Sequence, residues 1–215
     1  ENTAFGSSLA PIEVAAMEAM GLRTTEVIPY SPTTTDLTTE ITRIKAAKPD
    51  LLLANGYFQD GMAMARAIKE QRLDVMAVIG IVHGALSAPD FISQLGKDAE
   101  YYFSIGSALD PNDPRTAALL ENTERRFGTP IENLGIQAYQ MVHILADALE
   151  RAASTDRDRI LEALRTTKME NVVSPLFPEK VGEFDEKGQS KNVNLVTSQI
   201  QNGQLVNVVP AKYAH

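Results

Sequence analysis

The first 105 residues alternate between segments in which apolar residues recur with helical spacing and short runs that are almost wholly apolar. The helical spacing predicts helices over residues 7–20, 37–47, 60–72 and 89–96. The apolar runs predict strands over residues 25–30, 51–54, 75–80 and 101–105. This alternation of helix and strand indicates βαβ units, and therefore an α/β fold with a parallel sheet covered by helices on both faces.

The strand predicted at Leu51–Ala54 organises this half of the chain. Four consecutive apolar residues are typical of a strand that is buried on both faces of a parallel sheet. Asn55-Gly56 then indicates a turn, and Asp60 is placed to cap the following helix. Tyr57 and Phe58 would therefore lie at the carboxyl end of the strand, where open α/β sheets bind ligands. The alternative is that both rings only cover the edge of the core.

The pattern changes after Gly106, and the segment Gly106–Asp113 is the best candidate for a domain boundary. Helices are predicted over residues 114–127 and 131–153 and around Ile160–Leu164. The apolar stripe of the long helix consists of Leu134, Ala138, Met141, Leu145 and Leu149. Strand-like runs follow over residues 172–176, 193–200 and 205–209. Asn202-Gly203 between the last two runs predicts a hairpin.

The composition excludes several classes of function. The 215 residues carry a formal net charge of −8, which argues against a nucleic-acid partner. The absence of cysteine rules out disulfides, thiolate metal sites and cysteine nucleophiles. No apolar run approaches the roughly 18 residues of a membrane span. The G-x-G-x-x-G, phosphate-loop, G-x-S-x-G and H-E-x-x-H motifs are missing, so no enzyme, cofactor or metal site is predicted.

Three segments are predicted to form loops after strands: Thr3–Gly6, Asn55–Phe58 and Ile81–Gly84. In a parallel sheet all three would open at the same edge and face one cleft. Convergent aromatic rings with a few polar groups describe a small-molecule pocket better than a catalytic centre. The candidate ligand-binding residues are Phe5, Tyr57, Phe58 and His83, with Ala4 and Val82 beside them.

The order of these elements resembles the periplasmic substrate-binding proteins of ABC transporters of the branched-chain amino acid (Leu/Ile/Val-binding) type, which have the two-lobed, type I periplasmic-binding fold. The resemblance extends over nearly the whole chain. It rests on an aromatic-glycine loop, a helix-then-strand segment, a ligand-loop Gly-Tyr, a long helix and a late G-x-F-D-x-x-G turn. These are Asn2–Gly6, Asp36–Leu52, Asn55–Tyr57, Ala138–Leu149 and Gly182–Gly188.

The resemblance implies an incomplete first lobe. Residues 1–105 and about 191–210 would form the second, C-terminal lobe, and residues about 106–190 the returning part of the first lobe. The chain begins with neither an initiator methionine nor a signal peptide. We therefore expect a longer, exported protein that works in the periplasm, with the missing part of the cleft upstream of Glu1.

The resemblance also implies a function and a pocket. Aromatic residues at the positions of Phe5 and Tyr57 would line the pocket. The family's amino-acid binders place an acidic residue after the next strand, whereas Gly80–Gly84 holds no acid. An amino acid, an aromatic or aliphatic carboxylate and an amide all remain open as ligands, and His83 would donate to such a ligand.

The predicted function is that of the solute-binding component of an ABC importer, with a membrane permease as its partner. A ligand-sensing domain of a receptor or regulator with the same fold is the first alternative. An α/β enzyme whose catalytic residues lie upstream is the second. The sequence that adjoins this chain would distinguish the importer component from the sensing domain. Turnover of a bound ligand would identify the enzyme.

Overall fold

A computed structural model describes residues 1–106, 113–129, 131, 133–173, 181–191, 195–211 and 214. The chain divides into two compact units. The first consists of residues 1–106 and 196–215, and the second of residues 107–195. The correspondence of these units to two lobes of a binding protein stays a prediction.

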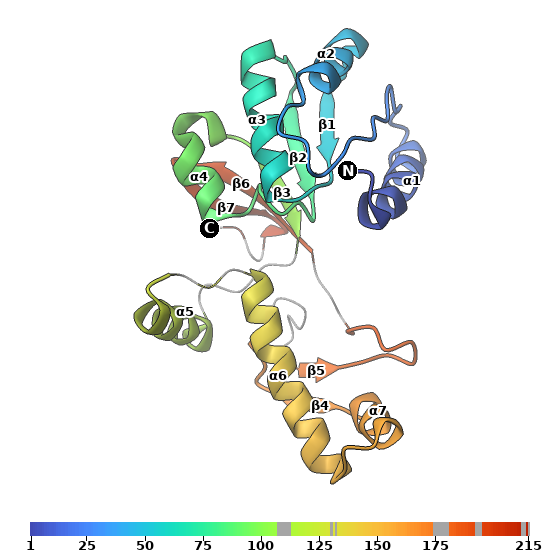
Figure 1. Cartoon of the computed structure of the whole chain (residues 1–215), viewed down its shortest axis with the longest axis vertical. Coiled ribbons are helices and arrows are strands. Elements are labelled where there is room, and N and C mark those ends of the chain that lie inside the picture. The colour runs from blue at the N-terminus through green and yellow to red at the C-terminus, as the bar shows by residue number, and fades with distance from the viewer. Residues whose placement is uncertain are drawn as a thin grey trace. The chain divides into compact units, whose positions relative to one another are not determined.

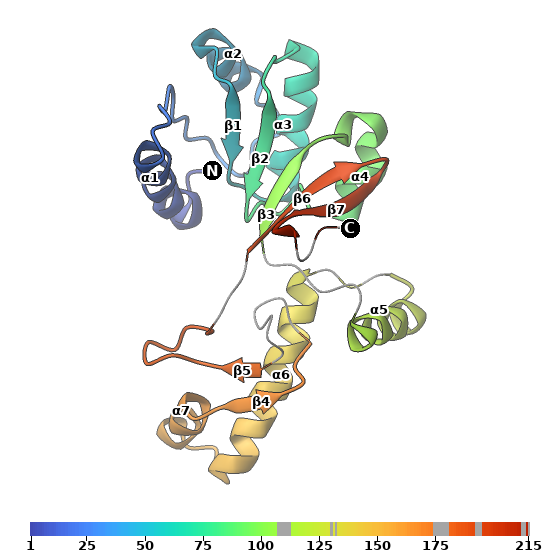
Figure 2. The ribbon, with the colours of Figure 1, turned by 180° about the vertical axis from the view of Figure 1, so that it is seen from behind.

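The first unit is built on a mixed, mostly parallel-wound sheet (Figures 1 and 2). The strands lie in the order β1-β2-β3-β6-β7; the first three run parallel, and β6 and β7 are antiparallel to their neighbours. The helices α3 and α4 lie on one face of the sheet, and α1 lies beyond the outer edge of β1. The strands are β1 Leu51–Ala54, β2 Ala77–Ile81, β3 Phe103–Gly106, β6 Val196–Gln201 and β7 Gln204–Val209.

The core of the first unit gathers around α3. This helix buries most positions of its first two turns, including Met62 and Met64. Leu37, at the N-cap of α2, and Ile41 within α2 pack into the same cluster. The helices of this unit are α1 Ala4–Ala19, α2 Thr38–Ala47, α3 Phe58–Gln71, α4 Pro89–Leu95 and the 3-10 helix η1 Gly96–Ala99.

Two expectations for the start of the chain are wrong. Thr3–Gly6 is not a strand-end loop, because α1 already begins at Ala4. Thr3 Oγ1 accepts a hydrogen bond from Phe5 N, and Glu1 Oε1 accepts one from Gly6 N at 2.6 Å, so the two side chains satisfy free N–H groups of the first turn. Residues 25–30 form no strand; they run without a ladder partner among the described residues.

The second unit is mainly helical. It contains α5 Pro114–Phe127, α6 Asn133–Ala152 and α7 Arg157–Arg165, with a short antiparallel pair of β4 Lys168–Glu170 and β5 Val181–Glu183. The strand predicted over 172–176 is not found at residues 172 and 173, and residues 174–176 lie outside the described part. The cap of α7 is Asp156, whose carboxylate accepts hydrogen bonds from the N–H groups of Asp158 and Arg159.

The long helix α6 buries a different face from the one predicted. Ile136, Ile144 and Ala148 are at most 1% exposed, whereas Leu134 and Leu145 of the predicted stripe are 75% and 45% exposed. Both faces are apolar, so periodicity alone does not say which one is covered. Within this unit the buried face meets Val172 and the half-buried Met169 and Leu164.

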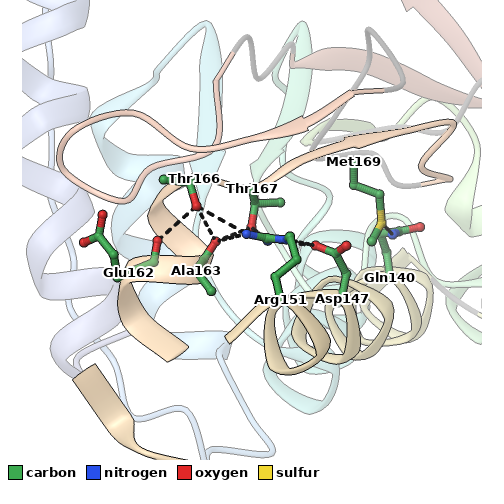
Figure 3. Close-up of polar contacts among 8 residues, drawn as sticks. All are labelled: Gln140, Asp147, Arg151, Glu162, Ala163, Thr166, Thr167 and Met169. Atoms are coloured by element: carbon green, nitrogen blue, oxygen red, sulfur yellow. Dashed lines mark hydrogen bonds and ion pairs between the residues drawn. The ribbon is translucent and has the colours of Figure 1, made fainter. Parts of the chain in front are cut away.

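Arg151 joins α6 to α7 (Figure 3). Its Nη1 donates to the carbonyl oxygen of Ala163 at 2.7 Å, and its Nη2 donates to Thr167 Oγ1 at 2.9 Å. Asp147, one turn earlier on α6, pairs with the same guanidinium at 2.7 Å. The guanidinium therefore satisfies carbonyl and hydroxyl acceptors at the C-terminal end of α7, which holds the two helices together.

Candidate ligand-binding site

The loops that follow β1 and β2 lie side by side, as expected for the carboxyl ends of neighbouring parallel strands. Gly84 N donates to the carbonyl oxygen of Gly56 at 2.9 Å, which ties the two loops together. After the turn at Asn55-Gly56, Tyr57 N donates to Asp60 Oδ1 at 2.8 Å. Asp60 thus caps α3 from inside its first turn, and this bond sets the direction in which Tyr57 leaves the sheet.

Two of the predicted aromatic residues meet at this edge. The rings of Phe5 and Tyr57 have centroids 6.0 Å apart and planes inclined by 42°. Tyr57 is 46% exposed and Phe5 is half-buried. An aromatic pair at this separation is within the range of favourable ring contacts, and its open side is available to an apolar group. Ala4, the first residue of α1, is exposed beside Phe5.

Phe58 and His83 were expected to face the cleft from loops, but both are at least partly buried. Phe58 is the first residue of α3, is half-buried and packs against the core, which is the structural role left open for it above. His83 is only 2% exposed. Direct contact of either side chain with a ligand stays a prediction.

The buried imidazole of His83 is neutral. Its Nδ1 accepts a hydrogen bond from Ala85 N at 3.2 Å, so the ring proton lies on Nε2. Nε2 has no hydrogen-bond partner in the described part of the chain. Burial lowers the pKa of His83 to about 4.

A buried polar cluster surrounds Gly56. A Cβ at Gly56 would lie against Asp60 Oδ2, 2.7 Å from the hydroxyl of Tyr30 and 3.0 Å from His83 Nε2. Asp60 is fully buried, and the Tyr30 hydroxyl donates to its Oδ2 at 2.9 Å. Burial and the charge of Asp60 raise the pKa of Tyr30 above its ordinary value. Glycine at position 56 is therefore what lets three polar side chains approach the turn.

Val82 adopts a strained backbone conformation at the same edge. Its φ is +51°, which is unfavourable for a β-branched residue, and its side chain is 54% exposed. Val82 N donates to the carbonyl oxygen of Ile105 at 2.8 Å, which holds the loop against β3. Strain of this kind concentrates at functional sites, so Val82 keeps its place among the candidate residues.

Sequence reasoning missed several polar contacts at this edge. Asn55 Nδ2 donates to Glu13 Oε1 at 2.8 Å and to the carbonyl oxygen of Ile81 at 3.2 Å. Tyr30 was expected at the end of a strand, and Asp60 only as a helix cap. The turn signal at Asn55-Gly56 was the one local clue to this cluster. Tyr30 and His83 are 25 or more residues away from the turn in the sequence, and Asp60 reaches it only because α3 begins there.

The described residues contain no group of three or more His, Asp or Glu side chains that could hold a metal ion. They also contain no helix long and apolar enough to cross a membrane.

Comparison with known proteins gives consistent relatives. A family model described as "Periplasmic binding protein" matches residues 1–204. Leu/Ile/Val-binding protein homolog 7 of Brucella melitensis is 22% identical over 98% of this chain and 53% of its own length. The leucine-, isoleucine-, valine-, threonine- and alanine-binding protein of Pseudomonas aeruginosa is 23% identical over 87% of this chain and 48% of its own length. The chain thus spans about half the length of the curated relatives it matches.

Solved structures show the same fold. A leucine-binding protein from Thermotoga maritima superposes with a TM-score of 0.82 at 20% identity, covering 96% of this chain and 57% of its own. A solute-binding protein of an ABC transporter from R. palustris, in complex with benzoate, superposes with a TM-score of 0.79 at 14% identity. It covers 96% of this chain and 55% of its own. At these identities the likeness concerns the type I periplasmic-binding fold.

Proposed function

The chain belongs to the periplasmic binding protein family, and we propose that it is part of the solute-binding component of an ABC importer. In this role the protein works in the periplasm, takes up a small molecule between two lobes and delivers it to a membrane permease. The relatives named above are binding proteins, which supports a role without catalysis.

The observation that carries this proposal is the aromatic pair of Phe5 and Tyr57. Tyr57 follows the carboxyl end of β1, where open α/β sheets bind ligands, and Phe5 of α1 lies against it; the pair leaves one ring 46% exposed. A ligand with a flat or aliphatic apolar part would cover this ring. Polar recognition would come from the turn backbone and from the part of the cleft that this chain does not supply.

The charges at this edge favour a ligand without an ammonium group. The carboxylate of Glu1 already accepts hydrogen bonds from Thr3 N and Gly6 N, and that of Asp60 from Tyr57 N and the Tyr30 hydroxyl. No acid stands in Gly80–Gly84. A buried ammonium group would therefore find no uncommitted counter-charge among these residues, which is costly. An aromatic or aliphatic carboxylate is the ligand class we favour over an ordinary amino acid.

The test uses the longest available gene product. A panel of branched-chain amino acids, aromatic acids, small aliphatic acids and amides is screened by thermal shift and followed by calorimetry. One hundred times the dissociation constant of a true ligand adds about 2.7 kcal/mol of stability, a shift on the order of 5–10 °C. Recovery of the compound unchanged separates binding from turnover.

Matched variants connect the ligand to the aromatic pair. Tyr57→Ala is expected to weaken binding by 10- to 100-fold, because it removes the exposed ring that the ligand would cover. Phe127→Ala is the control, since Phe127 is a 67% exposed aromatic residue at the end of α5 in the other unit. Equal affinity of the Tyr57→Ala variant and the unmodified protein would contradict the assignment of this edge.

A further inference from the structure

The imidazole of His83 occupies a slot that three glycines leave open. A Cβ at Gly61, in the first turn of α3, would lie 2.6 Å from His83 Cε1. A Cβ at Gly80 of β2 would lie 2.7 Å from His83 Cβ, and one at Gly56 would lie 3.0 Å from His83 Nε2. Carbon atoms this close cannot coexist, so the ring fits here only because these positions carry no side chain.

Two of these glycines stand where glycine is unfavourable. Gly61 lies inside a helix and Gly80 inside a strand, and at both positions glycine lowers stability relative to a residue with a side chain. The polar ring adds a further cost, because Nε2 is buried and has no hydrogen-bond partner among the described residues. An apolar side chain would fill the slot without that cost, so packing alone does not account for a histidine here.

The ring shapes the loop after β2 through its Nδ1 atom. Ala85 N donates to His83 Nδ1 at 3.2 Å, which closes a small turn around Gly84. Gly84 N in turn donates to the carbonyl oxygen of Gly56 at 2.9 Å. A Cβ at Gly84 would lie 3.2 Å from Tyr57 Cα, so this loop packs directly against the backbone of the exposed aromatic residue.

His83 therefore reaches Tyr57 by two routes. Its Nε2 edge lies beside Gly56, the residue that precedes Tyr57, and its Nδ1 atom holds the loop that bonds to the Gly56 carbonyl. The imidazole is only 2% exposed, whereas the ring of Tyr57 is 46% exposed. A change at His83 would thus be transmitted to the exposed ring through the backbone of the turn, without contact between the imidazole and a ligand.

We propose that His83 is a positioning residue of the ligand site: its Nδ1 acceptor fixes the loop that holds the Gly56-Tyr57 turn, and thereby the place of the Tyr57 ring. The inference rests on the function proposed above, because it concerns the affinity that Phe5 and Tyr57 give to a ligand. The acceptor at Nδ1 is the group that matters, and the Nε2–H donor is not required. Residues that support a binding group from behind affect affinity by fixing its geometry.

Two substitutions in the longest available gene product separate the acceptor from the bulk of the ring. His83→Asn offers a side-chain oxygen that accepts from the N–H group two residues later, as asparagine commonly does in turns. His83→Leu fills the slot but offers no acceptor. Ile41→Val is the control, because it removes a methyl group from a buried side chain of α2 and lowers stability outside the turn and its loop.

The first readout needs no ligand. Hydrogen exchange of the Gly84 amide is compared with that of the Ile200 amide, which bonds to the Tyr102 carbonyl within the same unit. We expect this ratio to rise about tenfold or more in His83→Leu, and by less than about threefold in His83→Asn and Ile41→Val. The second readout is the affinity for benzoate, a simple aromatic carboxylate, at pH 7.5. It should fall about tenfold in His83→Leu and recover to within about threefold in His83→Asn.

Two results would overturn the proposal. Equal exchange ratios of Gly84 in all four proteins would show that His83 does not hold the loop. Normal Gly84 exchange with equally weak benzoate binding in His83→Asn and His83→Leu would make the imidazole a direct ligand contact instead. If the unmodified protein does not bind benzoate, the ligand class proposed above is contradicted, and the exchange ratios still decide the role of His83.

Discussion

Acidification is expected to destabilise the first unit through His83. The native structure holds this ring neutral, because Nδ1 accepts from Ala85 N and the side chain is buried. Protonation would place a second N–H donor against the Ala85 N–H group and a charge in the core. The unfolded chain has no such constraint and binds a proton near the ordinary pKa of 6.5.

The sign and size follow from the two pKa values of His83. Between 6.5 and about 4 the unfolded state binds more protons than the folded state, so the free energy of unfolding decreases as the pH falls through this window. At roughly 1.4 kcal/mol per pH unit, the loss reaches at most about 3 kcal/mol near pH 4. Lowered pKa values of Glu1 and Asp36 act mainly below this window, where those carboxylates become protonated.

Urea unfolding at pH 7.5, 6, 5 and 4.5 measures this dependence. His83→Asn keeps an acceptor near the position of Nδ1 and removes the titrating group, so its stability should be lower at pH 7.5 but should change less between pH 6 and 4.5. His143→Asn is the control, because His143 is an exposed histidine on α6. An unchanged slope in His83→Asn, or an equal loss of slope in His143→Asn, would refute the reasoning.

Two substitutions probe the contacts that hold each unit together. Arg151→Met keeps the apolar stem but removes the bonds to Ala163 and Thr167, and it should lower the stability of the second unit by about 2 kcal/mol in urea unfolding. Arg125→Met removes an exposed pair with Glu121 and an exposed hydrogen bond to Asn122 Oδ1, and should change it by less than about 0.5 kcal/mol, so similar losses would argue against the helix-joining role. Gly56→Ala should lower the Tm by several degrees, because its Cβ would press on Asp60, Tyr30 and His83. A Cβ at Gly106 would have no described atom within 4 Å, so Gly106→Ala should be nearly neutral. A neutral Gly56→Ala would show that the polar cluster can open without cost.

Local sequence signals determined the helices and strands whose ends are marked by capping, proline or turn residues. The apolar run Leu51–Ala54 forms β1 as predicted, and Pro114 opens α5 behind its Asp113 cap. Asn202-Gly203 joins β6 to β7, with both residues at positive φ as a tight hairpin requires. In each case the deciding interaction is between residues a few positions apart, so the pattern in the sequence is sufficient.

The candidate site was predicted in part. The topology of parallel strands predicted that the loops after β1 and β2 would meet, and the structure brings Phe5 to Tyr57. Sequence spacing did not show that His83 is buried, that Phe58 starts a helix, or that Tyr30 reaches Asp60 from 30 residues away. Those facts depend on which side chains fill the space behind the turn, and that space exists only once α3 packs on the sheet.

Tertiary structure decided the outcome for segments whose apolar pattern was ambiguous. Residues 25–30 have strand-like composition but no strand beside them in the described part of the chain, and a ladder cannot form from one side alone. The helix α6 is apolar on two faces, so the contacts with Val172, Met169 and Leu164, and not the periodicity, selected the buried one. The sequence by itself therefore determined most of the helices and strands, their order and the α/β class. Packing between segments that are distant in the sequence decided which apolar surfaces are buried. A surface is buried only when a second surface packs against it, so the sequence of one segment does not show whether it is buried.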